Sequence, residues 1–307
     1  LVVYYMFEVG ENGVFLQGDI WYQRLDDNGM PVGSAVQVTA SDRDDQLADI
    51  YGDYIVYTSY DNIYTMTGNI TLYQISTGMT WSISRAPLVL EARIHGDIVV
   101  WRESDAVTYP QIPHVMLYNL TWLGTDHEPI MLSPKDIAAH CVDVGERFVV
   151  WSEYYESQLD VWAYDLAWGS RIGVTNTDVN EGYPRTSSDW VTWLMQDPEL
   201  DQESVQACNL VTGEFLTLAD PAEEQVSWAE IDGDIIAYSS NLTGNYDIYI
   251  HRLSTRSTYQ VTIDPSNQHL PCVYGDLLAY VDWERHGNED IYVVNLKQPV
   301  ADINGPY

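Results

Sequence analysis

The stretch Gly96-Asp97-Ile98-Val99-Val100-Trp101 decides the fold, because the chain repeats it. Each copy has a Gly-Asp pair or a close variant, then two or three apolar residues, then Tyr or Trp. The pair is typical of a tight turn, and the apolar run is typical of a strand. The closing aromatic residues are 53 positions apart from Tyr4 to Tyr57 and 42 apart from Trp151 to Trp193. The other copies begin at Gly52, Gly145, Ser188, Gly233 and Gly275, and the opening Leu1-Val2-Val3-Tyr4 resembles the end of one more.

Two further phrases accompany the first one. The second is a strand-like run, preceded in its best copies by Asp: Asp19-Ile20-Trp21, Asp160-Val161-Trp162, Asp247-Ile248-Tyr249 and Asp290-Ile291-Tyr292. The third is an apolar residue followed by Thr or Ser: Val38-Thr39, Ile83-Ser84, Leu132-Ser133, Val174-Thr175 and Val261-Thr262. Turn signals such as Thr77-Gly78 separate the second phrase from the third. Each unit therefore predicts four strands, A to D, with the Gly-Asp turn between A and B.

A four-stranded unit repeated at this spacing predicts an all-β fold, a seven-bladed β-propeller of antiparallel blades over residues 1–297. No segment has helical periodicity. Strand A of the first unit and strand D of the last are missing or irregular. Ring closure then requires residues outside this stretch or a non-standard final blade. Six blades plus an extra sheet is the alternative.

Strand A predicts how the blades meet around the axis. Nine positions before each strand-B aromatic lies a compact residue, which suits crowded inner strands: Ala48, Ala92, Val142, Pro184, Ala229 and Pro271. The next position holds Asp49, Arg93, Asp143, Arg185, Glu230 and Cys272. The sign of the charge alternates from unit to unit until the uncharged cysteine. We hypothesise a belt of inter-blade ion pairs near the axis, with a chance arrangement as the alternative.

The amino-acid composition limits the classes of molecule that the chain could bind. The formal net charge is −33, from 46 acidic and 13 basic residues, so nucleic acid and anionic membranes are excluded as partners. No apolar run is long enough for membrane insertion. The three cysteines fit neither a disulfide framework nor a CxxC metal pattern. The 23 Tyr and 11 Trp residues suit half-buried strands that present polar tips to water or to a partner.

An acidic surface attracts cations, and calcium is the one cofactor that the sequence suggests. Asp42, Asp44 and Asp45 lie in the loop before a strand A, and a second acidic loop covers 197–203. Such loops can supply the hard oxygen ligands that calcium takes. Neither loop matches a known calcium motif, so a solvated loop is the alternative reading of both.

The three phrases resemble the TolB-type β-propeller repeat of bacterial and archaeal cell-surface proteins, most clearly from Gln268 to Tyr292. Residues 298–307 resemble a linker and the first strand of a PKD domain, an immunoglobulin-like module of large extracellular proteins. These resemblances imply a fragment of a longer protein, exported to the outside of the cell or its surface. In an exported protein the sequons at Asn69, Asn119 and Asn241 are candidate glycosylation sites, which would make it a glycoprotein.

Two functions follow from this interpretation. The first is an extracellular structural, adhesive or interaction module that assembles into an array or filament. Its partners would be carbohydrate, other surface-protein subunits or further copies of itself as a homo-oligomer, contacted through loops rich in Tyr and Trp, namely 151–155 and 281–283. The alternative is a polysaccharide lyase or glycoside hydrolase acting at the channel mouth, near His140 and His269. No nucleophile elbow, zinc-protease motif or phosphate loop is present, so we expect no enzyme.

Overall fold

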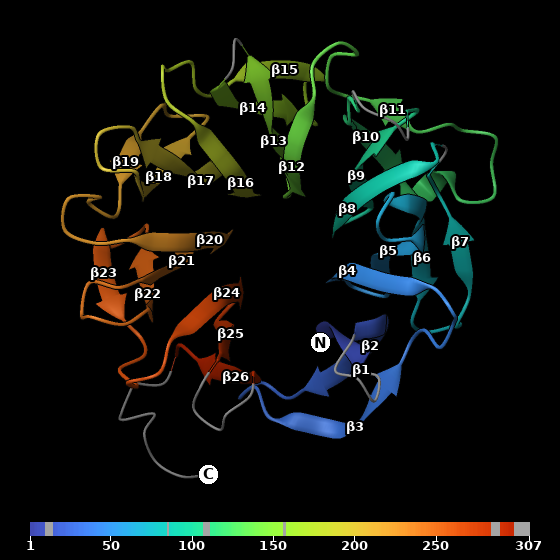
Figure 1. Cartoon of the computed structure of the whole chain (residues 1–307), viewed down its shortest axis with the longest axis horizontal. Helices are drawn as coiled ribbons and strands as arrows, with labels where there is room; N and C mark the ends of the chain where they lie inside the picture. The colour runs from blue at the N-terminus through green and yellow to red at the C-terminus, as the bar shows by residue number, and fades with distance from the viewer. Residues whose placement is uncertain (10–14, 85, 107–110, 156–157, 284–288, 298–307) are drawn as a thin grey trace.

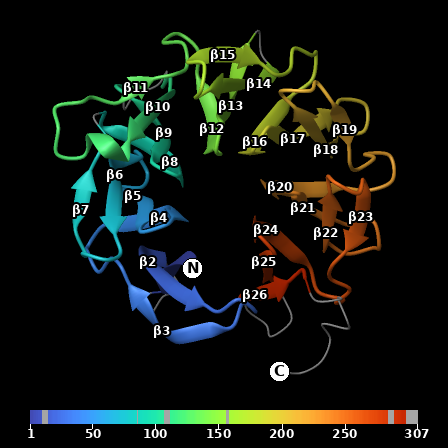
Figure 2. The same ribbon diagram turned by 180° about the vertical axis from the view of Figure 1, so that it is seen from behind.

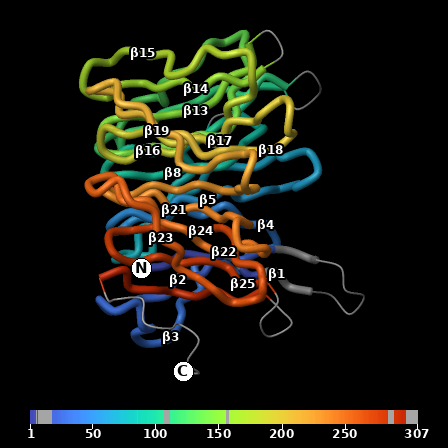
Figure 3. Tube along the Cα trace, turned by 90° about the vertical axis from the view of Figure 1, so that its left-hand side faces the viewer, coloured from blue at the N-terminus to red at the C-terminus, as the bar shows by residue number. Residues whose placement is uncertain are grey.

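The computed structural model describes residues 1–9, 15–84, 86–106, 111–155, 158–283 and 289–297, and antiparallel strands dominate it. The predicted all-β fold is confirmed. Groups of strands follow one another in a ring around a central axis (Figures 1 and 2), and Figure 3 shows the ring from the side. The segment that resembles a PKD domain, residues 298–307, lies outside the described residues. Within the described part, no helix is long and apolar enough to cross a membrane.

The strands form successive antiparallel units in chain order. Their bounds are β1(Val2–Val9), β2(Phe15–Leu25) and β3(Pro31–Gln37); β4(Asp44–Tyr51), β5(Tyr54–Asn62), β6(Thr67–Gln74) and β7(Thr80–Ser82); β8(Leu88–His95), β9(Ile98–Ser104), β10(His114–Asn119) and β11(Ile130–Met131); β12(Ala139–Val144), β13(Phe148–Tyr155), β14(Gln158–Asp165) and β15(Ser170–Gly173); β16(Glu181–Ser187), β17(Trp190–Asp197), β18(Gln202–Asn209) and β19(Phe215–Thr217); β20(Val226–Asp232), β21(Ile235–Ser240), β22(Asp247–Arg252) and β23(Ser257–Gln260); β24(Gln268–Tyr274), β25(Leu277–Asp282) and β26(Asp290–Asn295). A single bridge between Thr67 and Leu88 joins the second unit to the third.

The predicted strands A are the innermost ones, namely β4, β8, β12, β16, β20 and β24 (Figure 1). The first unit has strands equivalent to B, C and D, and the last unit has A, B and C. Among the described residues, β1 pairs only with β2, and β26 pairs only with β25. Within the part of the chain that the structure describes, β1 and β26 therefore each pair with another strand on one side only.

The Gly-Asp turn ties strands A and B to the end of strand C. Gly52 has φ of 58°, a left-handed conformation that glycine tolerates best. The Asp53 carboxylate accepts hydrogen bonds from the backbone N–H of Ser76 at 2.9 Å and from the Ser76 hydroxyl. Asp234 receives the same two bonds from Ser254. The repeated Asp is thus a structural residue that fixes where the next hairpin starts.

The third phrase also has a structural role. The Thr262 hydroxyl accepts a hydrogen bond from the backbone N–H of Ile248 at 2.8 Å and donates one to the Asp247 carboxylate at 3.1 Å. Thr39 makes the equivalent pair of bonds with Ile20 and Asp19. The recurring Asp of strand C therefore accepts a hydrogen bond from the hydroxyl that follows strand D.

Replacing Thr262 by valine should lower the free energy of unfolding by about 1–3 kcal/mol, because two buried polar groups lose their partner. Thr255 is exposed, so Thr255→Val should stay within about 0.5 kcal/mol of the parent chain. Urea titrations of both variants measure the difference. Equal effects would show that the hydroxyl of Thr262 contributes nothing specific.

The core lies between units. Trp151 is fully buried and packs in one cluster with Val142 of its own unit and with Val100 and Val115 of the preceding unit. Its indole N–H donates to the Glu153 carboxylate at 2.7 Å, as the Trp101 indole does to Glu103. Each unit thus buries its faces by stacking on its neighbours, as repeat architectures require.

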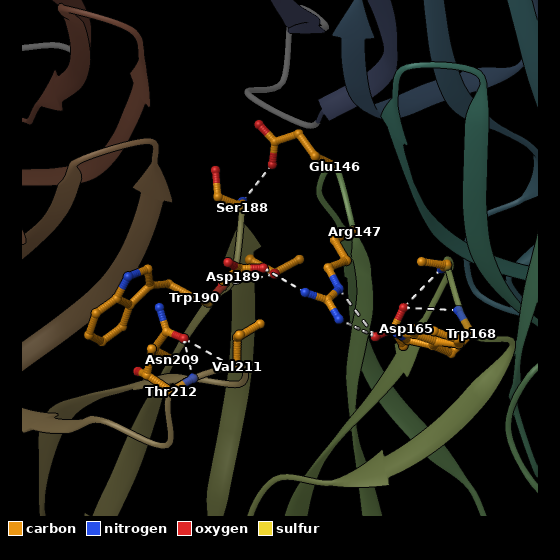
Figure 4. A network of polar contacts seen from close by, with 12 residues as sticks. Glu146, Arg147, Asp165, Trp168, Ser188, Asp189, Trp190, Asn209, Val211 and Thr212 are labelled. Atoms are coloured by element: carbon orange, nitrogen blue, oxygen red, sulfur yellow. Dashed lines mark hydrogen bonds and ion pairs between the residues drawn. The ribbon is translucent and has the colours of Figure 1, made fainter.

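Polar contacts connect neighbouring units on the face where strands A turn into strands B (Figure 4). Arg147 makes ion pairs with Asp165 of its own unit at 2.9 Å and with Asp189 of the next unit at 3.1 Å. The Glu146 carboxylate accepts a hydrogen bond from the backbone N–H of Ser188. These contacts come from the loosest copy of the repeat, in which Glu-Arg replaces the usual Asp.

The two ends of the chain's ring touch. The Asn295 amide donates to the backbone carbonyl of Asp27 at 2.7 Å. A Cβ added at Gly29 would lie 2.7 Å from a methyl carbon of Val293, so the β2–β3 turn packs directly against β26. The ring therefore closes through side chains, with no strand pairing between the first and last units among the described residues.

Candidate functional site

The innermost strands carry the charged residues of the hypothesised belt. Arg185 on β16 is buried and its guanidinium lies 2.8 Å from the Glu230 carboxylate on β20, in the next unit. Asp49 accepts a hydrogen bond from the backbone N–H of Ile94 at 2.9 Å, and Asp143 accepts one from Thr186 at 2.8 Å. The residues of the hypothesised belt thus connect neighbouring inner strands by one ion pair and two hydrogen bonds from backbone N–H groups to carboxylates.

Arg93 differs from Arg185, because its buried Nε has no hydrogen-bond partner among the described residues. Its charge still acts on Asp49, where it opposes the effect of burial, and burial raises the pKa of that carboxyl overall. A continuous alternation of ion pairs is therefore not what the geometry shows. The inner ring combines ion pairs with backbone contacts.

Burial raises the pKa of Asp143 from 3.8 to about 7, with Arg185 and Arg93 opposing this and Glu230 adding to it. The folded chain then holds this proton at pH values where the unfolded chain has released it. The contribution of this carboxyl to stability therefore falls as the pH rises from about 4 to 7, by up to about 1.4 kcal/mol per pH unit.

Asp143→Asn should therefore flatten the dependence of the unfolding free energy on pH between 4 and 7. Urea titrations across that range measure the slope. The matched control is Asp42→Asn, which changes an exposed carboxylate. A slope unchanged by Asp143→Asn would contradict a proton held at this position.

A second ion pair near the axis was missed by sequence reasoning. Arg102 on β9 pairs with Glu91 on β8 at 2.6 Å and donates to the carbonyl of Ala139 in the next unit at 3.0 Å. Glu91 also accepts from the backbone N–H of Val142 at 3.2 Å. The available signal was Arg102 itself, the one charged residue directly after a strand-B aromatic.

Most innermost strands contain a β-bulge with one residue at positive φ. These residues are Leu47, Cys141, Tyr183, Trp228 and Leu270, and none is glycine. Bulges bend a strand and redirect a side chain, which makes them common beside functional sites. At Tyr183 the result is an aromatic ring 48% exposed on the innermost strand of its unit.

Aromatic side chains gather where strands A begin and strands B end. His140 on β12 meets Tyr154 on β13 edge to face at 4.7 Å. His269 on β24 lies between Trp283, stacked at 4.1 Å, and Tyr246, tilted at 4.7 Å. With Tyr183, these residues form what we call the aromatic face: His140, Tyr154, Tyr183, Tyr246, His269 and Trp283.

The electrostatics of the aromatic face favour a platform of neutral rings, with Glu203 among the charged groups near it. Burial lowers the pKa of both His140 and His269, which keeps the imidazoles neutral near pH 7. Burial raises the pKa of Glu203. The Glu203 carboxylate lies close enough to Tyr183 and Tyr246 to add to the rise in the pKa of each phenol, which burial dominates.

Both loops that the sequence singled out supply exposed aromatic residues, with one correction. Tyr154, Tyr155 and Trp283 are exposed. Trp151 is fully buried within β13, so it belongs to the core and cannot contact a partner. Trp151 lies in the middle of β13, where both faces of the strand are buried, and its indole bonds to Glu153, whereas Tyr154 and Tyr155 lie at the exposed end.

The carboxylates proposed as calcium ligands do not share a hydrogen-bond partner. Asp44 accepts from the backbone N–H of Gly18 at 2.9 Å, and buried Asp45 accepts from the Ser41 hydroxyl at 3.2 Å. Asp42 is exposed. Within the part of the chain that the structure describes, no group of three or more His, Cys, Asp or Glu side chains is placed to hold a metal ion. Calcium binding stays a prediction.

The sequons lie at partly exposed positions. The Asn69 side chain accepts from the Ser82 hydroxyl at 3.2 Å. Asn119 precedes the 3-10 helix Leu120–Trp122 and accepts from the backbone and hydroxyl of Thr121. Asn241 accepts from the backbone N–H of Gln225 at 2.7 Å. Glycosylation of each asparagine stays a prediction.

Comparison with known proteins bears on the fold. No protein-family model matches the chain, and no curated protein matches its sequence. Among solved structures, the β-propeller domain of the Trilobed protease from Pyrococcus furiosus is similar with a TM-score of 0.70 and 10% identity, over 98% of this chain and 92% of that domain. That domain is described as having an open velcro topology.

Oligogalacturonate lyase from Vibrio parahaemolyticus is similar with a TM-score of 0.63 and 14% identity, over 91% of this chain and 82% of the lyase. TolB from Acinetobacter baumannii is similar with a TM-score of 0.52 and 13% identity, over 83% of this chain and 62% of that protein. The chain also matches prolyl endopeptidases and an acylaminoacyl peptidase, of which it spans about half the length. At these identities the likeness shows the fold alone, a TolB-like β-propeller.

Proposed function

We propose that this chain is a seven-bladed propeller that serves as an interaction module of a cell-surface protein and binds carbohydrate at the aromatic face. The proposal depends on one observation, the collection of Tyr, Trp and neutral His rings from four consecutive units at the same ends of their strands. Tyr and Trp offer rigid apolar faces with polar tips, which suit the faces and hydroxyls of sugar rings.

The charge of the chain limits the kinds of polysaccharide that it can bind. With a formal net charge of −33, the surface repels polyanions, so neutral polysaccharides are the better ligands. Glu203 beside Tyr183 and Tyr246 supplies an acceptor for sugar hydroxyls. Extracellular location, glycosylation and assembly into an array or filament belong to this proposal.

Affinity electrophoresis in gels that contain neutral or acidic polysaccharides tests the proposal. Neutral polysaccharide should retard the chain. Trp283→Ala and Tyr154→Ala should each weaken binding about fivefold or more. An aromatic side chain that the bound ligand covers contributes about 1 kcal/mol or more to affinity. Trp168 is exposed and lies outside the aromatic face, so Trp168→Ala should bind like the parent chain.

Two results would contradict the proposal. The first is mobility unchanged in every gel. The second is release of shortened sugars from the retarding polysaccharide, which would support a lyase or hydrolase instead.

A further inference from the structure

A hollow of about 450 Å³, which we call the inter-unit hollow, lies between the unit of β16–β19 and the unit of β20–β23. Trp190 on β17 and Asn209 at the end of β18 line it from the first of these units (Figure 4), and Asp234 and Leu253 line it from the second. It lies at the turns that join strands A to strands B, so the aromatic face is at the opposite ends of the strands. Its volume is within the range of small-molecule sites, about 300–1,000 Å³.

The side-chain amide of Asn209, in the wall of the inter-unit hollow, uses only one of its two polar atoms. Its oxygen accepts hydrogen bonds from the backbone N–H groups of Val211 at 3.0 Å and Thr212 at 2.9 Å, which shape the β18–β19 turn. Its nitrogen donates to no group among the described residues, although Asn209 as a whole is only 9% exposed. Buried donors in proteins are normally paired, so this one points to a bound molecule that accepts from it.

Equivalent side chains in other units use both polar atoms. Asn209, Asp165 and Asn295 each pair across the sheet with the first residue of their strand B, namely Trp190, Phe148 and Leu277. The second oxygen of Asp165 binds Arg147, and the amide nitrogen of Asn295 donates to the backbone carbonyl of Asp27 at 2.7 Å. By the same geometry, Asn209 is suited to a carbonyl oxygen, which accepts a hydrogen bond and has no proton of its own to place.

The charges around the inter-unit hollow are balanced. Three carboxylates line it, and each has an arginine partner: Asp189 with Arg147, Asp234 with Arg252, and Glu214 with Arg256. The chain as a whole carries a formal net charge of −33, so this balance is local. A charged ligand would have to compete with the existing ion pairs, whereas an uncharged ligand would not. The hollow therefore favours a neutral molecule.

Trp190 and Leu253 supply apolar surface in the same hollow. The guanidinium of Arg256 lies over the Trp190 ring, 5.4 Å from its centroid, and pairs with Glu214 of the neighbouring unit, which fixes the position of the ring. Aromatic faces of this kind suit the carbon face of a sugar ring. A polypeptide also presents carbonyl groups, but it is commonly bound along a sheet edge or an extended groove, whereas this hollow lies between the hairpin ends of two units.

We propose that the inter-unit hollow binds a neutral saccharide that carries an acetamido group. Asn209 donates to the acetamido carbonyl, and Trp190 and Leu253 contact the acetamido methyl group and the sugar ring. Asp189 and Glu214 each have a second carboxylate oxygen outside the printed ion pairs with arginine, and these oxygens accept from sugar hydroxyls. This inference does not depend on carbohydrate binding at the aromatic face.

The test is a titration of the chain with N,N′-diacetylchitobiose, followed by fluorine NMR of incorporated fluorotryptophan. The resonance of Trp190 is identified by its loss in Trp190→Phe. We expect a saturable shift of this resonance at millimolar sugar or below. Cellobiose has hydroxyls in place of the acetamido groups, so it should bind at least tenfold more weakly. Absence of a saturable shift at Trp190, or equal binding of cellobiose, would overturn the proposal.

A conservative variant tests the role of the amide. Asn209→Asp keeps an oxygen for the backbone N–H groups of Val211 and Thr212 and removes only the donor, so it should fold like the parent chain and bind at least tenfold more weakly. Asn119 has the equivalent position in another unit and does not line the hollow, so Asn119→Asp should bind like the parent chain.

Three further outcomes would overturn the proposal. The first is equal binding by Asn209→Asp and the parent chain. The second is equal binding of N-acetylglycine methylamide, which would show that a carbonyl is recognised without a sugar. The third is a shift of the Trp283 resonance alone, which would place the sugar at the aromatic face and leave the proposed function intact.

Discussion

Replacing Trp151 by alanine should lower the free energy of unfolding by about 3–5 kcal/mol, the usual cost of removing a fully buried aromatic side chain. Trp151 is 0% exposed and packs against residues of two units. The loss is a large share of the roughly 5–15 kcal/mol by which folded domains are stable. Urea titration followed by circular dichroism measures the change.

The chain supplies a matched control for this variant. Trp168 is 78% exposed, so Trp168→Ala should change the unfolding free energy by less than about 0.5 kcal/mol. If the two variants lost similar stability, the core would not lie between the units as described. A loss below about 1 kcal/mol in Trp151→Ala would lead to the same conclusion.

Arg185→Met should be similarly costly, at about 3–5 kcal/mol, because it leaves a largely buried carboxylate without its cation. The guanidinium of Arg185 is 6% exposed and lies 2.8 Å from Glu230. The double variant Arg185→Met, Glu230→Gln should recover much of the loss, since no uncompensated charge then remains between these two positions.

The ion pair of Arg43 and Asp61, at 2.6 Å, is the control, because it is exposed whereas the Arg185–Glu230 pair is largely buried. Its side chains are 42% and 54% exposed, so Arg43→Met should cost no more than about 1 kcal/mol. If Arg185→Met and Arg43→Met cost the same, the inner ring of charges would have no structural importance.

The repeat was visible in the sequence because each phrase does a local job. Gly52 adopts the positive φ of the turn, and the Asp53 carboxylate accepts a hydrogen bond from the backbone N–H of Ser76. The Thr262 hydroxyl accepts one from a backbone N–H at the start of strand C. Because each unit needs these interactions, turn residues and hydrogen-bonding side chains recur at fixed positions. Apolar alternation between them identifies the strands. Strand order within a unit follows directly, because successive strands joined by short turns pair antiparallel.

The geometry of the inner strands could not be predicted in the same way. Their bulges place Leu47 and Tyr183 at positive φ, a conformation that the sequence would signal only if glycine stood there. The extra residue of each bulge shifts the register of strand A against strand B. The charged side chains of strand A therefore face partners other than those that regular pairing would give. Arg102 stood out as a charged residue after a strand-B aromatic, but its partner Glu91 could not be identified from the sequence, whereas the Arg185–Glu230 contact followed from the alignment of units.

The aromatic face was foreseen only in part. Tyr154 and Trp283 stood out as members of loops rich in aromatic residues. Tyr183 and Tyr246 did not, because their neighbourhood with Glu203 depends on how separate units stack around the axis. Trp151 was assigned to the same loops because its sequence proximity to Tyr154 does not show where the buried middle of β13 gives way to its exposed end.

The most direct test of the ring is a cross-link between its two ends. Asp27→Cys and Asn295→Cys would be introduced into a chain whose natural residues Cys141, Cys208 and Cys272 are replaced by Ala, and the pair treated with a short bis-maleimide. Because the amide of Asn295 lies 2.7 Å from the carbonyl of Asp27, we predict an intramolecular link in the monomer, identified by mass spectrometry of the joined peptides. Links only between molecules, or none, would contradict a ring in which the first and last units meet.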